Sequence, residues 1–320
     1  MNREALLRAA AAGTAAATLP RLAAAQVRTP LHIATLPVDT DATAWFAADQ
    51  GFFAQNGLDV TIDVITSGGA IVSGVTGGAL DVGVASIGSL STAHARGLPV
   101  VALAPGGVYN GAAPTTVLAV AQNSPLRTAK DLAGKTIAIQ TLGELASFTI
   151  SSWLDKNGGD AKSVKFVEIP TSAMADAIVK GRVDAGFIAE PFFTQGKPAI
   201  RFFGPAYDGV AKRFLISAWV ARRDWIERNP EVAAKFVTAM RASAVWGNQR
   251  KNLAASGAIL GKYTHIEPET IAKMTRAQFA LTLDPAMLQP VIDVSAQFGV
   301  IPKPFPAAEI IAKLPASTIP

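Results

Sequence analysis

The chain has 320 residues, of which 50% are hydrophobic and 17% are charged, so its length allows about two domains at the usual ~100–200 residues each. A formal net charge of +5 without a run of Lys or Arg argues against nucleic-acid binding. The lack of any cysteine excludes disulfides, thiolate metal sites, a cysteine nucleophile and a lipid anchor attached to cysteine.

The first segment has the layout of a secretory signal peptide. Arg3 and Arg8 precede an apolar, Ala-rich stretch at 9–19, and the alanines at 23–25 provide a small-residue cleavage site. The apolar part is shorter than the ~20 residues that a membrane-spanning helix needs. We therefore expect residues 1–25 to be a signal peptide and the mature protein to be periplasmic, without a lipid anchor.

Strands and helices alternate in the segment that follows. We expect strands at 31–36, 58–65 and 82–85, separated by helices at 42–53 and from Ser67 to about residue 76. Strands that alternate with helices predict a parallel sheet with helices on its faces.

The same order of elements recurs about a hundred residues later. The elements expected there are strands at 135–140, 164–169 and 187–188, a helix at 145–155 and a second helix opened by Ser172. Both units contain Asn-Gly after their first helix and a Gly-x-x-Asp-x-Gly motif before their third strand, at 78–83 and 181–186. We interpret this repetition as a duplication, which predicts two similar α/β lobes instead of one large sheet.

The chain is expected to cross between these lobes near 112–114 and again near 208–213. The predicted division places residues 26–112 and 212–320 in lobe 1 and residues 113–211 in lobe 2. A strand at 214–221 and helices from 230 to about 260 and from 268 to about 281 should follow the second crossing, before a Pro-rich end.

Four motifs occur in a characteristic order. They are Ala48-x-x-Gly51-Phe52-Phe53-x-x-x-Gly57-Leu58-Asp59-Val60, Gly78-x-x-Asp81-x-Gly83, Asp131-Leu132-x-Gly134-Lys135-Thr136-Ile137 and Gly181-x-x-Asp184-Ala185-Gly186 with Glu190-Pro191. This set resembles the NMT1/THI5-like group of ABC-importer solute-binding proteins, which includes binders of nitrate, sulfonates, taurine and thiamine precursors. The resemblance covers about residues 27–250.

The resemblance implies a type II periplasmic-binding-protein fold, in which two α/β lobes joined by two hinge strands close over a ligand. It further implies a monomer without cofactor or enzyme activity, which delivers a small solute to an inner-membrane ABC permease. Two alternatives share the fold. One is a sensor subunit that hands its ligand to a signalling receptor. The other is an intracellular pyrimidine synthase of the thiamine pathway, but that branch carries a Cys-rich metal motif and this chain has no cysteine.

In an open α/β sheet, ligands lie beyond the carboxyl ends of the strands, where helix N-termini present free N–H groups. Six loops have this position in the predicted lobes: 37–43, 67–70, 86–89, 140–144, 171–174 and 189–193. The candidate ligand-binding residues in them are Asp39, Thr40, Asp41, Ser67, Gly68, Ser86, Ile87, Gln140, Thr141, Glu144, Thr171, Ser172 and Glu190.

The six loops contain no Lys or Arg, whereas four of the candidates are acidic. Like charges repel more strongly as water is excluded, which disfavours a multiply charged anion such as sulfate. A singly charged sulfonate or carboxylate held by helix N-termini stays compatible, as does a neutral or amine-bearing ring such as a pyrimidine. The aromatic side chains considered as stacking walls are Trp45, Tyr109, Phe148, Phe192 and Phe193. The three histidines, at 32, 94 and 265, have no metal-ligand spacing.

Overall fold

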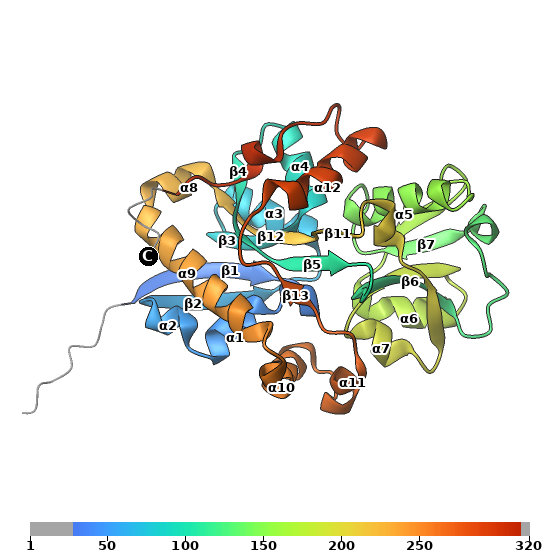
Figure 1. Ribbon diagram of the computed structural model, residues 1–320, viewed down its shortest axis with the longest axis horizontal. Coiled ribbons are helices and arrows are strands. Elements are labelled where there is room, and N and C mark those ends of the chain that lie inside the picture. Colours follow the sequence, from blue (N-terminus) through green and yellow to red (C-terminus); the bar gives the residue numbers. More distant parts are fainter. Residues whose placement is uncertain (1–27, 315–320) are drawn as a thin grey trace, which may run out of the picture.

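Two five-stranded sheets form the centres of two lobes in the computed structural model, which describes residues 28–314 (Figure 1). The expected signal peptide at 1–25 lies outside the described residues. The sheet of lobe 1 has the order β2-β1-β3-β12-β4. Its strands are β1 (Thr29–Thr35), β2 (Leu58–Val64), β3 (Val82–Ser86), β4 (Val100–Pro105) and β12 (Ser217–Arg222).

The sheet of lobe 2 has the same plan. Its order is β8-β7-β9-β6-β10, with β6 (Thr116–Ala121), β7 (Thr136–Ile139), β8 (Lys165–Glu168), β9 (Ala185–Ala189) and β10 (Ile200–Gly204). In each sheet the second strand of this order is parallel to both neighbours, and the fourth strand is antiparallel to both of its own. The two similar α/β lobes predicted from the sequence repeat are therefore confirmed by the topology.

The repeated Gly-x-x-Asp-x-Gly motif has the same structural role in both lobes. Asp81 Oδ2 accepts a hydrogen bond of 2.9 Å from the backbone N–H of His32, and the Asp81 N–H donates to the carbonyl of His32 at 2.9 Å. Asp184 makes the same pair of bonds, each of 2.9 Å, with Thr136. The first glycine of each motif has φ of +81° or +66°, which a residue with a side chain rarely adopts. The motif thus fastens one strand to its neighbour.

Seven helices of the two sheet-forming units cover the sheets: α1 (Thr43–Asp49), α2 (Phe52–Gln55), α3 (Gly68–Gly77), α4 (Ile87–Ala95), α5 (Leu145–Lys156), α6 (Thr171–Val179) and α7 (Phe192–Gly196). The single helix predicted at 42–53 is wrong. It is two helices, α1 and α2, because Gly51 has a left-handed φ of +73° that interrupts the helical backbone. The helix expected to open at Ser172 begins one residue earlier, at Thr171.

Two antiparallel strands connect the lobes (Figure 1). β5 (Gly107–Asn110) leads toward lobe 2 and β11 (Arg213–Leu215) returns to lobe 1, and β13 (Gln278–Phe279) completes this small third sheet. The single strand expected at 214–221 is therefore two strands, β11 and β12, which belong to different sheets. The predicted lobe limits at 112/113 and 211/212 stay a prediction.

The C-terminal helices are α8 (Arg223–Arg228), α9 (Pro230–Gly247), α10 (Leu253–Thr264), α11 (Pro268–Lys273) and α12 (Pro285–Gln297). The predicted helix from 230 to 260 is divided into α9 and α10 by a 3-10 turn at 250–252, and the helix predicted at 268–281 ends at Lys273 because the chain then joins β13. α9 contacts α1 of lobe 1, whereas α11 contacts α7 and α12 contacts α5 of lobe 2, so this region touches both lobes. None of the helices within 28–314 combines the length and apolar character needed to cross a membrane.

Candidate functional site

A cavity of about 90 Å³ lies between the two lobes. Lobe 1 lines it with Leu36, Val38, Thr40, Asp41, Gly68, Ser86, Ile216 and Ser217, and lobe 2 with Thr116, Gln140, Thr141, Glu144, Leu145, Ala146, Thr171, Phe187, Ala189 and Tyr207. Most of these residues follow the carboxyl ends of strands or begin helices, which is the position expected for a ligand site in α/β sheets.

Eight of the thirteen residues predicted from the sequence line this cavity: Thr40, Asp41, Gly68, Ser86, Gln140, Thr141, Glu144 and Thr171. They come from five of the six predicted loops and from both lobes. The structure brings together positions up to about 130 residues apart in the chain. The other five, Asp39, Ser67, Ile87, Ser172 and Glu190, are not among the lining residues.

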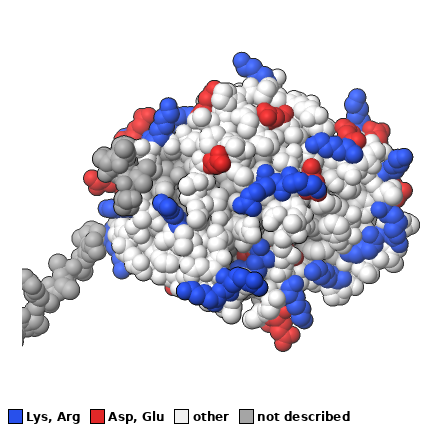
Figure 2. Space-filling view, viewed as in Figure 1, with Lys and Arg blue, Asp and Glu red and all other residues white. Residues whose placement is uncertain are grey.

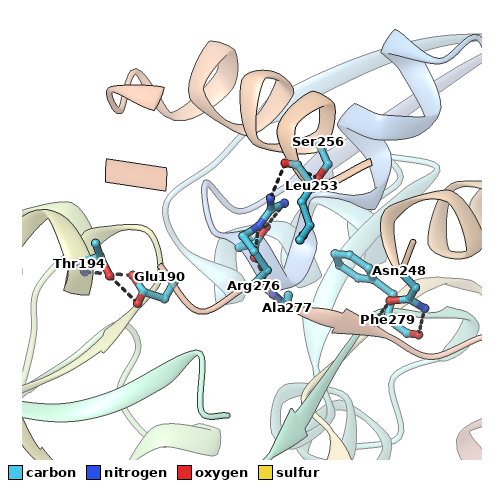
Figure 3. A network of polar contacts seen from close by, with 9 residues as sticks. Glu190, Thr194, Asn248, Leu253, Ser256, Arg276, Ala277 and Phe279 are labelled. Atoms are coloured by element: carbon cyan, nitrogen blue, oxygen red, sulfur yellow. Dashed lines mark hydrogen bonds and ion pairs between the residues drawn. The ribbon is translucent and has the colours of Figure 1, made fainter. Parts of the chain in front are cut away.

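Two of these five are acids whose carboxylates bind protein donors instead. Asp39, which is 0% exposed, accepts hydrogen bonds from Arg276 Nε and Nη2, each at 3.1 Å, and from the N–H of Ala277 at 2.6 Å. Glu190 accepts from the Thr194 N–H at 2.9 Å and from its hydroxyl at 2.7 Å (Figure 3). Figure 3 also shows Arg276 reaching the carbonyl of Leu253, to which its Nη1 donates at 3.2 Å. Both carboxylates are therefore structural.

The remaining three are placed by their helices. Ser67 caps α3, with its hydroxyl accepting a bond from the Ala70 N–H at 3.4 Å. Ile87 is 0% exposed because its side chain packs in the core of lobe 1. Ser172 lies on the exposed side of α6.

Asp41 lies at the lobe 1 wall and is almost completely buried, with 3% exposed. The Ser217 hydroxyl donates to Asp41 Oδ1 at 2.6 Å, and the N–H of Gly107 donates to that hydroxyl at 3.3 Å, which leaves the hydroxyl proton for Asp41. Burial raises the pKa of Asp41 to about 7, the bond from Ser217 opposes this rise, and the charge of Asp39 adds to it.

Glu144 provides the corresponding acid of lobe 2. Its carboxylate lies beside the first turn of α3, because a methyl group placed on Gly68 would be 3.6 Å from Oε2 and one on Gly69 would be 3.7 Å from Oε1. Burial raises the pKa of Glu144, a hydrogen bond from Ser89 lowers it, and the charge of Glu168 raises it. A side chain of one lobe thus lies against the first turn of a helix in the other.

Other contacts also join the lobes around the cavity. Gln140 Nε2 donates to the carbonyl of Thr66 at 3.2 Å, and the N–H of Asp39 donates to the carbonyl of Glu190 at 3.1 Å. A methyl group on Gly88 of α4 would lie 2.9 Å from the backbone nitrogen of Leu145 in α5. The two lobes therefore meet closely, and the cavity is in a closed arrangement.

Three polar lining residues were not predicted: Thr116, Tyr207 and Ser217. Thr116 and Ser217 are the first residues of β6 and β12, directly after the crossings between lobes, so their position on a crossing is the signal that points to them. Tyr207 lies in the 3-10 turn at 206–209, just before the second crossing, with its ring edge-on to that of Phe187 at 4.8 Å. Burial and, second, the charge of Asp41 raise the pKa of Tyr207.

None of the five aromatic residues considered as stacking walls lines the cavity. Trp45, Tyr109 and Phe148 are completely buried or nearly so. The aromatic side chains at the cavity are instead Phe187 and Tyr207. Within residues 28–314, no group of three or more His, Asp or Glu side chains is arranged to hold a metal ion.

The family model described as "NMT1/THI5 like" matches residues 41–249, which contain most of the cavity wall. The chain belongs to the NMT1/THI5-like family. The resemblance inferred from the four sequence motifs is therefore confirmed.

Relatives of this NMT1/THI5-like protein have different named roles. The putative aliphatic sulfonates-binding protein of Escherichia coli K12 is 27% identical over 248 residues, which are 70% of this chain and 72% of that one. The 4-amino-5-hydroxymethyl-2-methylpyrimidine phosphate synthase of Schizosaccharomyces pombe is 22% identical over 299 residues, covering 87% of this chain and 80% of the synthase.

Among solved structures, the alkanesulfonate-binding protein SsuA from Xanthomonas axonopodis pv. citri, bound to MOPS, superposes with a TM-score of 0.74 at 19% identity. The match covers 89% of this chain and 98% of that protein. The NMT1/THI5-like chain therefore has the periplasmic-binding-protein fold, with two α/β lobes, as expected.

Proposed function

We propose that this protein is the periplasmic solute-binding component of an ABC importer and that it captures a small organic solute between its lobes. The observation that carries the proposal is a cavity whose walls come from both lobes, since such a cavity forms only when the lobes meet. Membership of the NMT1/THI5-like family and similarity to a putative aliphatic sulfonates-binding protein support it.

In this proposal the ligand is held by hydroxyl, amide and carboxyl groups from the lining residues. The eight predicted lining residues act with Thr116, Tyr207 and Ser217. The sequence leaves a sulfonate, a carboxylate or a pyrimidine-like ring as the solute class. The protein works as an exported monomer, and its closed form docks transiently on an inner-membrane permease.

The similarity to a pyrimidine phosphate synthase makes an enzyme the second candidate. The binding function is favoured because the resemblance places a Cys-rich metal motif in the synthase branch, and this chain contains no cysteine. The two candidates differ in what happens to a bound molecule: a binding protein returns it unchanged, and a synthase does not.

A solute screen tests the proposal. Thermal unfolding of the mature protein is measured with sulfonates, nitrate, aromatic carboxylates, pyrimidines and small amines. A true ligand raises the apparent stability by RT ln(1 + [L]/Kd), or about 2.7 kcal/mol at a hundredfold excess over Kd. The bound solute should be recovered chemically unchanged. A screen without a stabilising solute, or recovery of a converted product, contradicts the proposal.

Closure of the lobes is tested by Gly88→Ala. The added methyl group would lie 2.9 Å and 3.0 Å from the backbone N and Cα of Leu145 in the other lobe, so it should hold the lobes apart. Because Ala favours a helix more than Gly, α4 should still form. We expect affinity for a screened solute to fall about 10-fold or more, and small-angle X-ray scattering with saturating solute should give a larger radius of gyration than for the wild type.

Gly77→Ala is the matched control, since a methyl group on Gly77, at the end of α3, would meet no atom within 4 Å. That variant should bind and close like the wild type. If G88A also closes and binds normally, capture does not require the observed contact between α4 and α5.

A further inference from the structure

The four acidic candidates fall into two classes that the sequence does not distinguish. In each lobe one carboxylate is occupied by protein donors: Asp39 by Arg276 and Ala277, and Glu190 by Thr194. In each lobe a second acid lines the cavity: Asp41 in lobe 1 and Glu144 in lobe 2. The cavity therefore has one acidic side chain on each of its two facing walls.

Within residues 28–314, the protein provides few hydrogen bonds and no counter-charge to these two cavity carboxylates. Among the described residues, the Asp41 carboxylate accepts one side-chain hydrogen bond, from Ser217, and Glu144 receives one from Ser89, although a carboxylate offers about four acceptor positions. No Lys or Arg is present among the lining residues. The charges of Asp39, itself paired with Arg276, and of Glu168 act on the two acids, and both disfavour ionisation.

The protein surface, unlike the cavity, carries many Lys and Arg side chains. Lys and Arg side chains are distributed over the visible face, interspersed with Asp and Glu (Figure 2), and the whole chain has a formal net charge of +5. The lack of cations at the cavity is therefore a local property. Burying two carboxyl groups without a counter-charge is unfavourable, and a cation between them would offset that cost.

An anion in the cavity would be repelled by the same two carboxylates. Helix N-termini attract anions, and α3 begins at the cavity wall with Gly68. The Glu144 carboxylate, however, lies beside that first turn, 3.6 Å from the position of a methyl group on Gly68. The Glu144 carboxylate therefore places a negative charge beside this helix start, which disfavours a sulfonate or nitrate there.

We propose that the solute carries a compact cationic nitrogen group, an ammonium or amidinium, which binds between Asp41 of lobe 1 and Glu144 of lobe 2. This inference rests on the proposed solute-binding function and specifies its ligand. A cation that contacts one carboxylate in each lobe is attracted to both lobes at once, so its binding favours the closed arrangement. The hydroxyl groups of Thr40, Thr116 and Thr171 remain available as acceptors for the other N–H groups.

The test uses two sets of compounds with nearly the same shape and different charge: acetamidinium, acetamide and acetate, and benzamidinium, benzamide and benzoate. Affinities are measured by isothermal titration calorimetry at pH 8 and low ionic strength. We expect the amidinium of at least one set to bind about 10-fold or more tightly than its amide and its carboxylate, because hydrogen bonds between charged groups are stronger than neutral ones. An amide or carboxylate that binds as tightly as the amidinium overturns the inference.

Asp41→Asn and Glu144→Gln locate the effect. Each keeps the shape of the side chain and removes its charge, and each should weaken amidinium binding about 10- to 100-fold while changing amide binding less than about 3-fold. Asp59→Asn, which removes a charge from the exposed face of β2, is the control and should change neither. Unchanged amidinium binding in both cavity variants also overturns the inference.

Failure of this inference differs from failure of the proposed function. An anionic or uncharged solute identified in the screen above overturns the cationic preference and leaves the solute-binding function intact. If no solute of any charge class stabilises the protein, the proposed function itself fails.

Discussion

Asp41→Asn is expected to make the ligand-free protein more stable at pH 8. Burial raises the pKa of Asp41 from 3.8 to about 7, so the folded state holds a proton that the unfolded state has already lost between these pH values. Stability contributed by this group therefore falls as pH rises through that range. The variant lacks this loss, and its free energy of unfolding should exceed that of the wild type by about 2 kcal/mol at pH 5 and by up to about 4 kcal/mol at pH 8.

Urea denaturation between pH 5 and pH 8 measures this difference. The carbonyl oxygen of the introduced amide can still accept the hydrogen bond from Ser217, so the packing around the site should be preserved. The exposed control, Asp59→Asn, should differ from the wild type by less than about 0.5 kcal/mol at every pH. The raised pKa of Asp41 is contradicted if Asp41→Asn is less stable than the wild type at pH 8. It is also contradicted if the difference in the free energy of unfolding does not change with pH.

Arg276→Ala is expected to destabilise the protein by about 3–5 kcal/mol, because it leaves a buried carboxylate without its partner. The Asp39 side chain is 1% exposed and that of Arg276 is 15% exposed, and their ion pair measures 3.1 Å. The ion pair joins the 3-10 turn at 39–41 to the segment before β13, 237 residues away in the chain. Urea denaturation at pH 7 measures the loss.

Two further variants show where this cost comes from. Arg228→Ala makes the same substitution in an exposed ion pair with Asp224, whose side chains are 65% and 55% exposed, and should cost about 1 kcal/mol or less. Asp39→Asn combined with Arg276→Met removes both charges and keeps most of the volume, so it should recover most of the stability. A double variant as unstable as R276A would mean that lost packing, and not the unpaired carboxylate, accounts for the effect.

The sequence alone predicts the alternating elements and the loops that form the cavity, because both depend on local patterns. Gly78-x-x-Asp81-x-Gly83 and its repeat fix where two strands begin, and Ser67 fixes the start of α3. Since the carboxyl ends of parallel strands meet at one edge of a sheet, the order of strands already brings these loops together. The eight predicted residues that line the cavity, the first of which is Thr40 and the last Thr171, are therefore predictable from the sequence.

The roles of individual acids do not follow from local patterns. Asp39 and Asp41 are two residues apart, yet only the first meets Arg276, which comes from the C-terminal region of the chain, 237 residues away. Glu190 and Glu144 differ in the same way, because only Glu190 accepts hydrogen bonds from Thr194. The position of Thr194 in turn depends on where α7 begins. Ser217 was missed because the strand predicted at 214–221 is divided between two sheets, and that division depends on long-range pairing.

The position of β12 has a consequence for the order in which the lobes can fold. All strands of the lobe 2 sheet lie within residues 116–204, whereas the lobe 1 sheet needs β12, at 217–222, between β3 and β4. During synthesis, lobe 2 therefore has its complete set of strands before lobe 1 does. Until β12 is synthesised, β3 and β4 each lack a partner strand on one side. Completing the lobe 1 sheet then requires a contact between residues more than a hundred positions apart, which slows folding. A chain that stops before residue 217 should contain one foldable lobe and not two.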